Sequence, residues 1–180
     1  MLIAKEKIKS NITEYLIYMF QIENLIRACR FDNQLIEEKL VSQYKVDEPT
    51  RLEIKSWYFG LKELMIEEQI ENEGHLQFLV NKMNELYDFH LFLLQSDDHP
   101  DYKQLFKRTE KALNSFISVT PELNNPIRSA IENLYRISVL KMTGREVSPN
   151  MLLAAGKAGA LLQLLSKKFA EYEKGELTIE

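Results

Sequence analysis

The sequence has little of what builds disulfide-rich, fibrous or nucleic-acid-binding proteins. Its 180 residues include one cysteine, Cys29, which cannot form an intramolecular disulfide, so a disulfide scaffold is excluded. Six glycines and five prolines are too few for a collagen-like or low-complexity chain. The formal net charge of −4 argues against a general nucleic-acid binder, because such proteins usually carry a basic surface.

Long apolar runs are also missing. None approaches the roughly 18–20 residues that a helix needs to cross a bilayer. The first ten residues contain Lys5, Glu6, Lys7 and Lys9, and no apolar segment of secretory-signal length follows them. We therefore expect a cytoplasmic protein that neither spans a membrane nor binds nucleic acid.

The common enzyme signatures are absent as well. The sequence contains no phosphate loop, dinucleotide fingerprint, HExxH or CxxC motif. It also has no Glu-x-x-His pair, so the ligands of a ferritin-like di-iron site are missing. We predict no catalytic residue, no cofactor and no metal, and an enzyme is the less favoured class of protein.

What the sequence does contain is apolar residues with a period of 3.6, whereas alternation with period two is not convincing anywhere. This pattern predicts an all-α fold, a single-domain irregular bundle of about seven helices over residues 1–180, with a frayed tail from about 175. The expected helices span about 8–30, 33–43, 47–71, 75–95, 101–118, 127–142 and 149–174.

Helix starts are marked by side chains that can cap a helix N-terminus. Caps are predicted at Asp32, Asp47 and Ser148. Asn11 with Glu14 forms a further capping pair, which could begin a shorter version of the first helix.

Four helices are expected to supply most of the core, namely 8–30, 47–71, 75–95 and 149–174. The 75–95 helix is apolar over most of its circumference, so we expect it to be the most buried. The 47–71 helix is apolar on two sides, which favours a central position between several neighbours.

Polar residues on apolar helix faces are the best candidates for a site, because a buried polar group must be paired. Glu23 lies within the apolar arc of its helix, and Arg27 is placed one turn later to pair with it. His90 lies near the centre of an apolar arc and His75 at its edge. These groups predict either a pocket for a small ligand, such as an anion, or a satisfied structural network. The candidate ligand-binding residues are Glu23, Arg27, Trp57, Tyr58, His75 and His90.

The last predicted helix carries a strip of small residues that includes Ala155, Ala158 and Gly159. Small side chains let another helix approach closely. The strip therefore predicts tight core packing or the seam of a homodimer.

A carboxylate pattern at 67–71 and 85–88 resembles the EExxE…ExxD set of the all-helical nucleotide pyrophosphohydrolases. That resemblance implies Mg²⁺ ions that activate water. If residues 72–74 form the turn of a helical hairpin, however, Glu71 and Asp88 lie about 20 Å apart along the helix axes. This separation is too large for a shared metal pair.

Several segments together are similar to a bacterial family called domain of unknown function 4924. They are residues 14–28, 42–48, 57–58, 74–77 and 85–94. The resemblance covers most of the chain, to about residue 172, and implies a compact, single-domain, all-helical protein. It implies no activity.

Three hypotheses follow for the function. The first is a non-enzymatic helical interaction module that acts through a homo-oligomer or a protein partner. The second is a small-molecule-binding domain that uses Glu23, Arg27 and His90. The third, less favoured, is a Mg²⁺-dependent nucleotide pyrophosphohydrolase.

Overall fold

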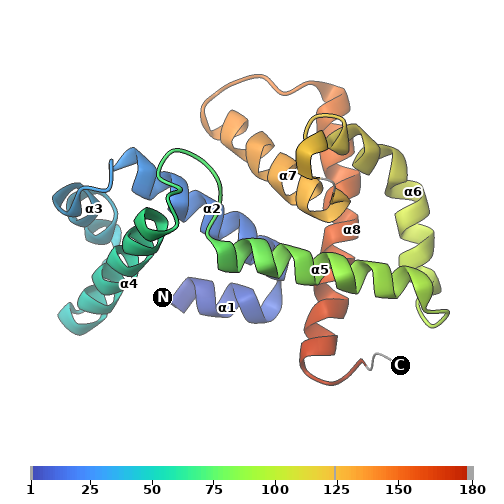
Figure 1. Ribbon diagram of the computed structural model, residues 1–180, viewed down its shortest axis with the longest axis horizontal. Helices are drawn as coiled ribbons and strands as arrows, with labels where there is room; N and C mark the ends of the chain where they lie inside the picture. Colours follow the sequence, from blue (N-terminus) through green and yellow to red (C-terminus); the bar gives the residue numbers. More distant parts are fainter. Residues whose placement is uncertain (1, 124, 178–180) are drawn as a thin grey trace.

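The computed structural model describes residues 2–123 and 125–177 (Figure 1). Within these residues all regular structure is helical, with eight α-helices and two short 3₁₀ helices. The α-helices are α1 (Leu2–Ser10), α2 (Ile12–Ala28), α3 (Asn33–Lys39), α4 (Glu48–Glu67), α5 (Gln77–Gln95), α6 (Pro100–Ile117), α7 (Pro126–Met142) and α8 (Pro149–Glu173), and the 3₁₀ helices are η1 (Val41–Gln43) and η2 (Pro121–Leu123). The predicted all-α fold is confirmed.

The predicted caps form as local chemistry dictates. Asp32 accepts a hydrogen bond from the Leu35 amide at 2.8 Å, and Ser148 accepts one from the Met151 amide at 3.3 Å. Asp47 caps α4 in the same way. Each side chain satisfies a backbone N–H that has no partner within its helix.

The prediction of one continuous helix over 8–30 is wrong, because the chain breaks at Asn11. Asn11 is extended, with φ −155° and ψ 96°, and its side chain accepts from the Glu14 amide at 3.1 Å. The Glu14 carboxylate in turn accepts from Asn11 Nδ2 at 3.2 Å. This reciprocal capping ends α1 and starts α2 although the apolar stripe continues across both helices.

The central position predicted for the 47–71 helix is also wrong. Figure 1 shows α4 beside α3 at one end of the molecule, with α6 at the opposite end. α4 packs on α2, α3 and η1, and two of its apolar side chains point to solvent, with Leu52 57% and Ile66 40% exposed. The helix ends at Glu67, earlier than predicted, because Gln69 takes a left-handed φ of +58°.

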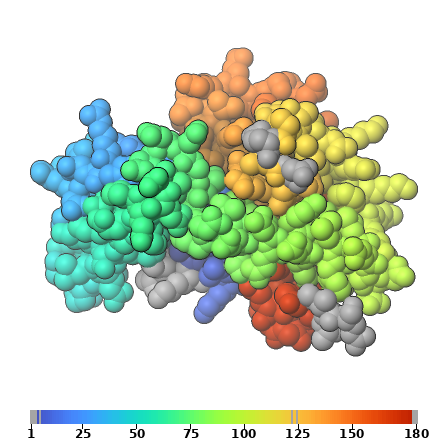
Figure 2. All heavy atoms as spheres, in the orientation of Figure 1, coloured from blue at the N-terminus to red at the C-terminus, as the bar shows by residue number. Residues whose placement is uncertain are grey.

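The core lies where α2, α5, α7 and α8 pack on one another, and α6 covers α7 and α8. α5 crosses the face seen in Figure 2, drawn in green. It is not the most buried helix, because α2 buries a larger share of its residues and α5 leaves Phe78 and Leu91 partly exposed. α4 also contributes to the core through the buried side chains of Ile54, Tyr58, Leu61 and Met65. The four predicted helices therefore all supply core residues, and α7 adds to them.

The last helix ends near its predicted boundary. α8 stops at Glu173, and Gly175 follows with a φ of +73°, a conformation that glycine adopts without steric cost. Of the frayed tail predicted from about 175, residues 178–180 lie outside the described residues.

Among the described helices, none is long and apolar enough to cross a membrane.

Candidate functional site

A buried carboxylate joins α2 to the segment that leads into α5. Glu23 is fully buried, and its Oε1 accepts the Leu76 backbone N–H at 2.8 Å. Its Oε2 lies 2.5 Å from His75 Nδ1, within hydrogen-bond distance. The His75 ring also stacks on Phe20, with the ring centroids 3.7 Å apart. Glu23 and Phe20 thus fix the orientation of the imidazole, and its second nitrogen, Nε2, points away from Glu23.

Arg27 does not pair with Glu23, which corrects the prediction from helical spacing. Its Nη2 donates to the carbonyls of Ile70 at 2.9 Å and Gly74 at 2.6 Å, and its Nε donates to Ile70 at 3.3 Å. Nη1 donates to Asn24 Oδ1 at 3.1 Å. The loop between α4 and α5 has carbonyls without helical partners, and the planar guanidinium satisfies two of them at once. Arg27 therefore ties this loop to α2.

α7 brings a tyrosine to the same place. Asn24 Nδ2 donates to the hydroxyl of Tyr135, whose ring packs edge-on against Phe20 at 5.7 Å. Burial raises the pKa of the Tyr135 phenol above its ordinary value, and the Asn24 hydrogen bond only partly opposes this shift. The phenol therefore stays protonated at neutral pH and can donate a hydrogen bond.

Two arginines of α7 share one carboxylate near Tyr135. Arg128 Nε donates to Glu132 Oε1 at 2.9 Å, and Arg136 Nη2 lies 4.0 Å from Glu132 Oε2. The Glu132 side chain is largely buried, whereas that of Arg136 is half exposed. One negative charge thus lies between two positive charges, and part of the Arg136 fork is available to a ligand.

These groups surround a cavity of about 290 Å³ between α2, α7 and the α4–α5 loop. Three guanidinium groups and two carboxylates contribute to its wall, together with the His75 imidazole and the Tyr135 phenol. The positive charges and N–H donors are those that bind carboxylate or phosphate groups. The lining residues are Asn24, Arg27, Asn72, Glu73, Gly74, His75, Arg128, Glu132, Tyr135 and Arg136.

His90 lies in a different place, between α5 and α6. Its Nδ1 is 2.6 Å from the Tyr102 hydroxyl, and its ring packs edge-on against Phe106 at 5.1 Å. Burial lowers the pKa of His90 to about 4, so the imidazole is neutral at neutral pH and shares one hydrogen bond with the Tyr102 hydroxyl. His90 is a satisfied core histidine and does not join Glu23 and Arg27 in one site.

Trp57 and Tyr58 are also outside the cavity lining. The Tyr58 hydroxyl lies 3.1 Å from that of Tyr44, and the Trp57 ring packs edge-on against Tyr58 at 5.0 Å. Burial raises the pKa of Tyr58, and the Tyr44 hydrogen bond adds to the shift. These rings hold α4 near η1 and do not face the candidate ligand.

The structure thus brings together Glu23, Arg27 and His75 and adds residues that sequence reasoning missed. A signal for the α7 residues exists, because Arg128, Glu132 and Arg136 repeat every four positions and so share one helix face. The sequence does not show which helix that face meets, so the signal could not be joined to Glu23.

The carboxylates of the pyrophosphohydrolase-like pattern do not gather. In the part of the chain that the structure describes, no three His, Cys, Asp or Glu side chains are placed to hold a metal ion. Glu85 instead lies 2.6 Å from Lys82, and Glu68 accepts the Gln77 backbone N–H at 2.7 Å. These side chains bind their own neighbours.

Comparison with known proteins gives one match. The family model described as Domain of unknown function (DUF4924) matches residues 1–176. No curated protein and no solved structure matches the chain.

Proposed function

The chain belongs to the DUF4924 family, whose description assigns no activity, and from the geometry of the site we propose that it binds a small anionic molecule. The ligand occupies the cavity between α2, α7 and the α4–α5 loop. The observation that carries the proposal is that Arg27, Arg128 and Arg136 line one cavity together with His75, a histidine held by the buried Glu23. This is the second hypothesis from the sequence, with the α7 residues in place of His90.

The roles of the lining residues differ. Arg27 already donates to two loop carbonyls, so it shapes the wall. The Arg136 side chain is half exposed, and its distance of 4.0 Å from the Glu132 carboxylate is too long for a hydrogen bond. Its N–H groups are therefore the most available donors in the cavity. Tyr135 offers its hydroxyl, and His75 offers Nε2. A carboxylate or phosphate group fits this set of donors.

The size of the cavity limits the ligand. About 290 Å³ lies at the lower end of the volumes of small-molecule sites. A compact molecule with one or two anionic groups fits this space, whereas a dinucleotide is too large.

Calorimetric titration with inorganic phosphate and with citrate tests the proposal. Each probe should bind the wild-type chain at one site, and choline, a cation, should not bind. Arg136→Gln should weaken binding of the anions at least tenfold, because it removes the most available guanidinium and disturbs no short hydrogen bond.

Arg145→Gln is the matched control, because Arg145 is exposed and does not line the cavity. It makes the same change of net charge and should leave affinity unchanged. If neither probe shows saturable binding at millimolar concentration, or if both variants weaken binding equally, the proposed site is wrong.

A further inference from the structure

The small residues of α8 line an open surface. Ala158 is fully buried, as expected for core packing, but Gly156 and Ala160 are exposed. A Cβ atom added at Gly156 or Gly159 would meet nothing within 4 Å. Close packing inside the chain therefore does not explain these glycines, although glycine lowers the stability of a helix interior. Their small size leaves room for the backbone of another molecule to approach α8 closely.

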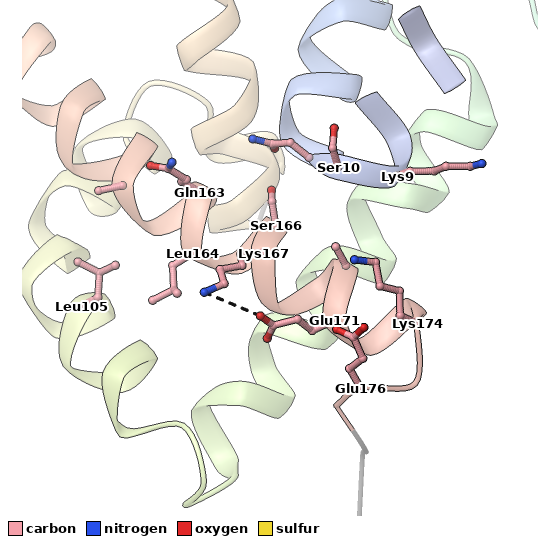
Figure 3. A pocket seen from close by; sticks show the side chains of 13 residues that line it. Lys9, Ser10, Leu105, Gln163, Leu164, Ser166, Lys167, Glu171, Lys174 and Glu176 are labelled. Atoms are coloured by element: carbon pink, nitrogen blue, oxygen red, sulfur yellow. Dashed lines mark ion pairs between the residues drawn. The ribbon is translucent and has the colours of Figure 1, made fainter. Parts of the chain in front are cut away.

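Two adjoining hollows follow this side of α8. One, of about 830 Å³, is bounded by α1, α6 and α8 (Figure 3), and the other, of about 360 Å³, continues along α6 toward the start of α8. Leu105 and Ala160 line both hollows, so the two hollows form a single groove. The groove extends from Leu152 to Lys174, which is about 33 Å at 1.5 Å per residue. This length accommodates a helix of about 20 residues.

The floor of the groove is apolar or small where α6 meets α8. Leu105 and Leu164 lie on neighbouring helices, as Figure 3 shows, and Leu153 is 62% exposed. Along α8, Gly156 and Ala160 lie between Leu153 and Leu164, and their small size allows the backbone of a docked helix to approach closely. Leu105 and Leu164 are partly buried against the core, so the apolar surface is most exposed at the Leu153 end of the groove. Apolar side chains exposed together are typical of a binding surface.

The edges of the groove are mainly basic. Positive charges lie along it at Arg108, Lys157, Lys167, Lys9 and Lys174, and negative charges lie only near its end, at Glu171 and Glu176. Lys167 is 3.9 Å from Glu171, the contact drawn as a dashed line in Figure 3. Within the described residues, Arg108 and Lys157 have no ion-pair partner. The charge of the groove therefore complements an acidic ligand.

We propose that this groove binds an amphipathic helix of a partner protein that has an apolar ridge and acidic flanks. The ridge contacts Leu105, Leu153 and the small residues of α8, and the acidic flanks face the basic edges. A second copy of the chain fits less well, because it would place the same basic edges against each other. The groove shares no lining residue with the anion cavity, so the two proposals are independent.

Two synthetic amphipathic peptides of about 18 residues test the partner's chemistry. Both carry the same leucine and alanine ridge, and one has glutamate flanks and the other lysine flanks. By fluorescence anisotropy, the acidic peptide should bind the full chain at least tenfold more tightly. The difference in affinity between the two peptides should become smaller as salt is added, because salt screens exposed charges.

Gly156→Leu tests the position of the peptide without a risk of misfolding. The side chain enters open space and replaces a glycine in a helix, so Tm should rise. Because the leucine fills the floor of the groove, affinity for the acidic peptide should fall at least tenfold. Gly60→Leu is the matched control: Gly60 also lies within a helix, in α4, and its added Cβ also meets nothing within 4 Å. It should raise Tm without changing affinity.

Three results would overturn the proposal. They are equal or absent binding of the two peptides, unchanged affinity in Gly156→Leu, and a wild-type dimer in native mass spectra that Gly156→Leu converts to a monomer. The last result would assign the groove to a second copy of the chain.

Discussion

Glu23 and His90 are both buried on apolar helix faces, and each finds polar partners in a different way. The Glu23 carboxyl group accepts a hydrogen bond from the Leu76 amide and lies within hydrogen-bond distance of His75 Nδ1. His90 instead stays neutral at neutral pH and shares a hydrogen bond with the Tyr102 hydroxyl. The first arrangement leaves one imidazole nitrogen for a ligand, whereas the second is enclosed by aromatic rings. At the scale of single residues, therefore, two similar sequence signals have different outcomes.

The neutral state of His90 predicts a loss of stability in acid. The pKa of His90 is lowered from 6.5 to about 4 by burial, so between these values the unfolded chain binds a proton that the folded chain does not. The free energy of unfolding should therefore decrease as pH falls from about 6.5 to about 4, by roughly 3 kcal/mol from this residue. Denaturant unfolding at several pH values measures the effect.

The double variant His90→Phe/Tyr102→Phe removes both polar partners and should lack this share of the pH dependence. Tyr102→Phe alone keeps the buried histidine, so this variant should retain most of the pH dependence of the free energy of unfolding. Identical pH profiles for the two variants would mean that His90 titrates normally in the folded protein.

At the scale of elements, the boundaries of helices depend on local capping more than on the apolar stripe. Asn11 divides a stripe that otherwise reads as one helix, and a left-handed residue at Gln69 ends α4. Tertiary contacts also support the start of α2, where the Thr13 hydroxyl lies 2.8 Å from that of Ser166 in α8. Periodicity alone extends a helix through such a point, because it carries no information about the backbone angles there.

Asn11→Ala should destabilise the protein by about 1 kcal/mol, because the Glu14 amide loses its cap. Chemical denaturation measures this change. Asn114→Ala is the control, since Asn114 is exposed inside α6 and alanine there favours the helix. If Asn11→Ala is as stable as the wild type, packing rather than capping holds the break between α1 and α2.

At the scale of the whole molecule, stability should be uneven. α3, η1 and α4 form an arm at one end that packs on the rest mainly through α2, whereas α8 packs on α1, α2, α5, α6 and α7. An arm that packs mainly on one helix of the remaining molecule loses fewer contacts when it opens, so local unfolding of this arm costs less free energy. The loop after α4 contributes to the anion cavity, so this motion is coupled to the proposed site.

Native-state hydrogen exchange tests this expectation. Amides within 48–67 should exchange faster than amides within 149–173 under the same conditions. Equal protection of the two helices would show that the arm unfolds only with the whole molecule.

Sequence alone was sufficient for properties that depend on neighbours along the chain. The all-helical fold, the caps at Asp32, Asp47 and Ser148, and the burial of Glu23 and His90 all follow from local spacing and side-chain chemistry. The partners of those buried groups depend on which helix faces meet, and helical periodicity contains no distance between helices. Only the tertiary structure therefore placed Arg27 on the loop carbonyls, brought Tyr135 and Arg136 beside His75, and left Gly156 facing open space.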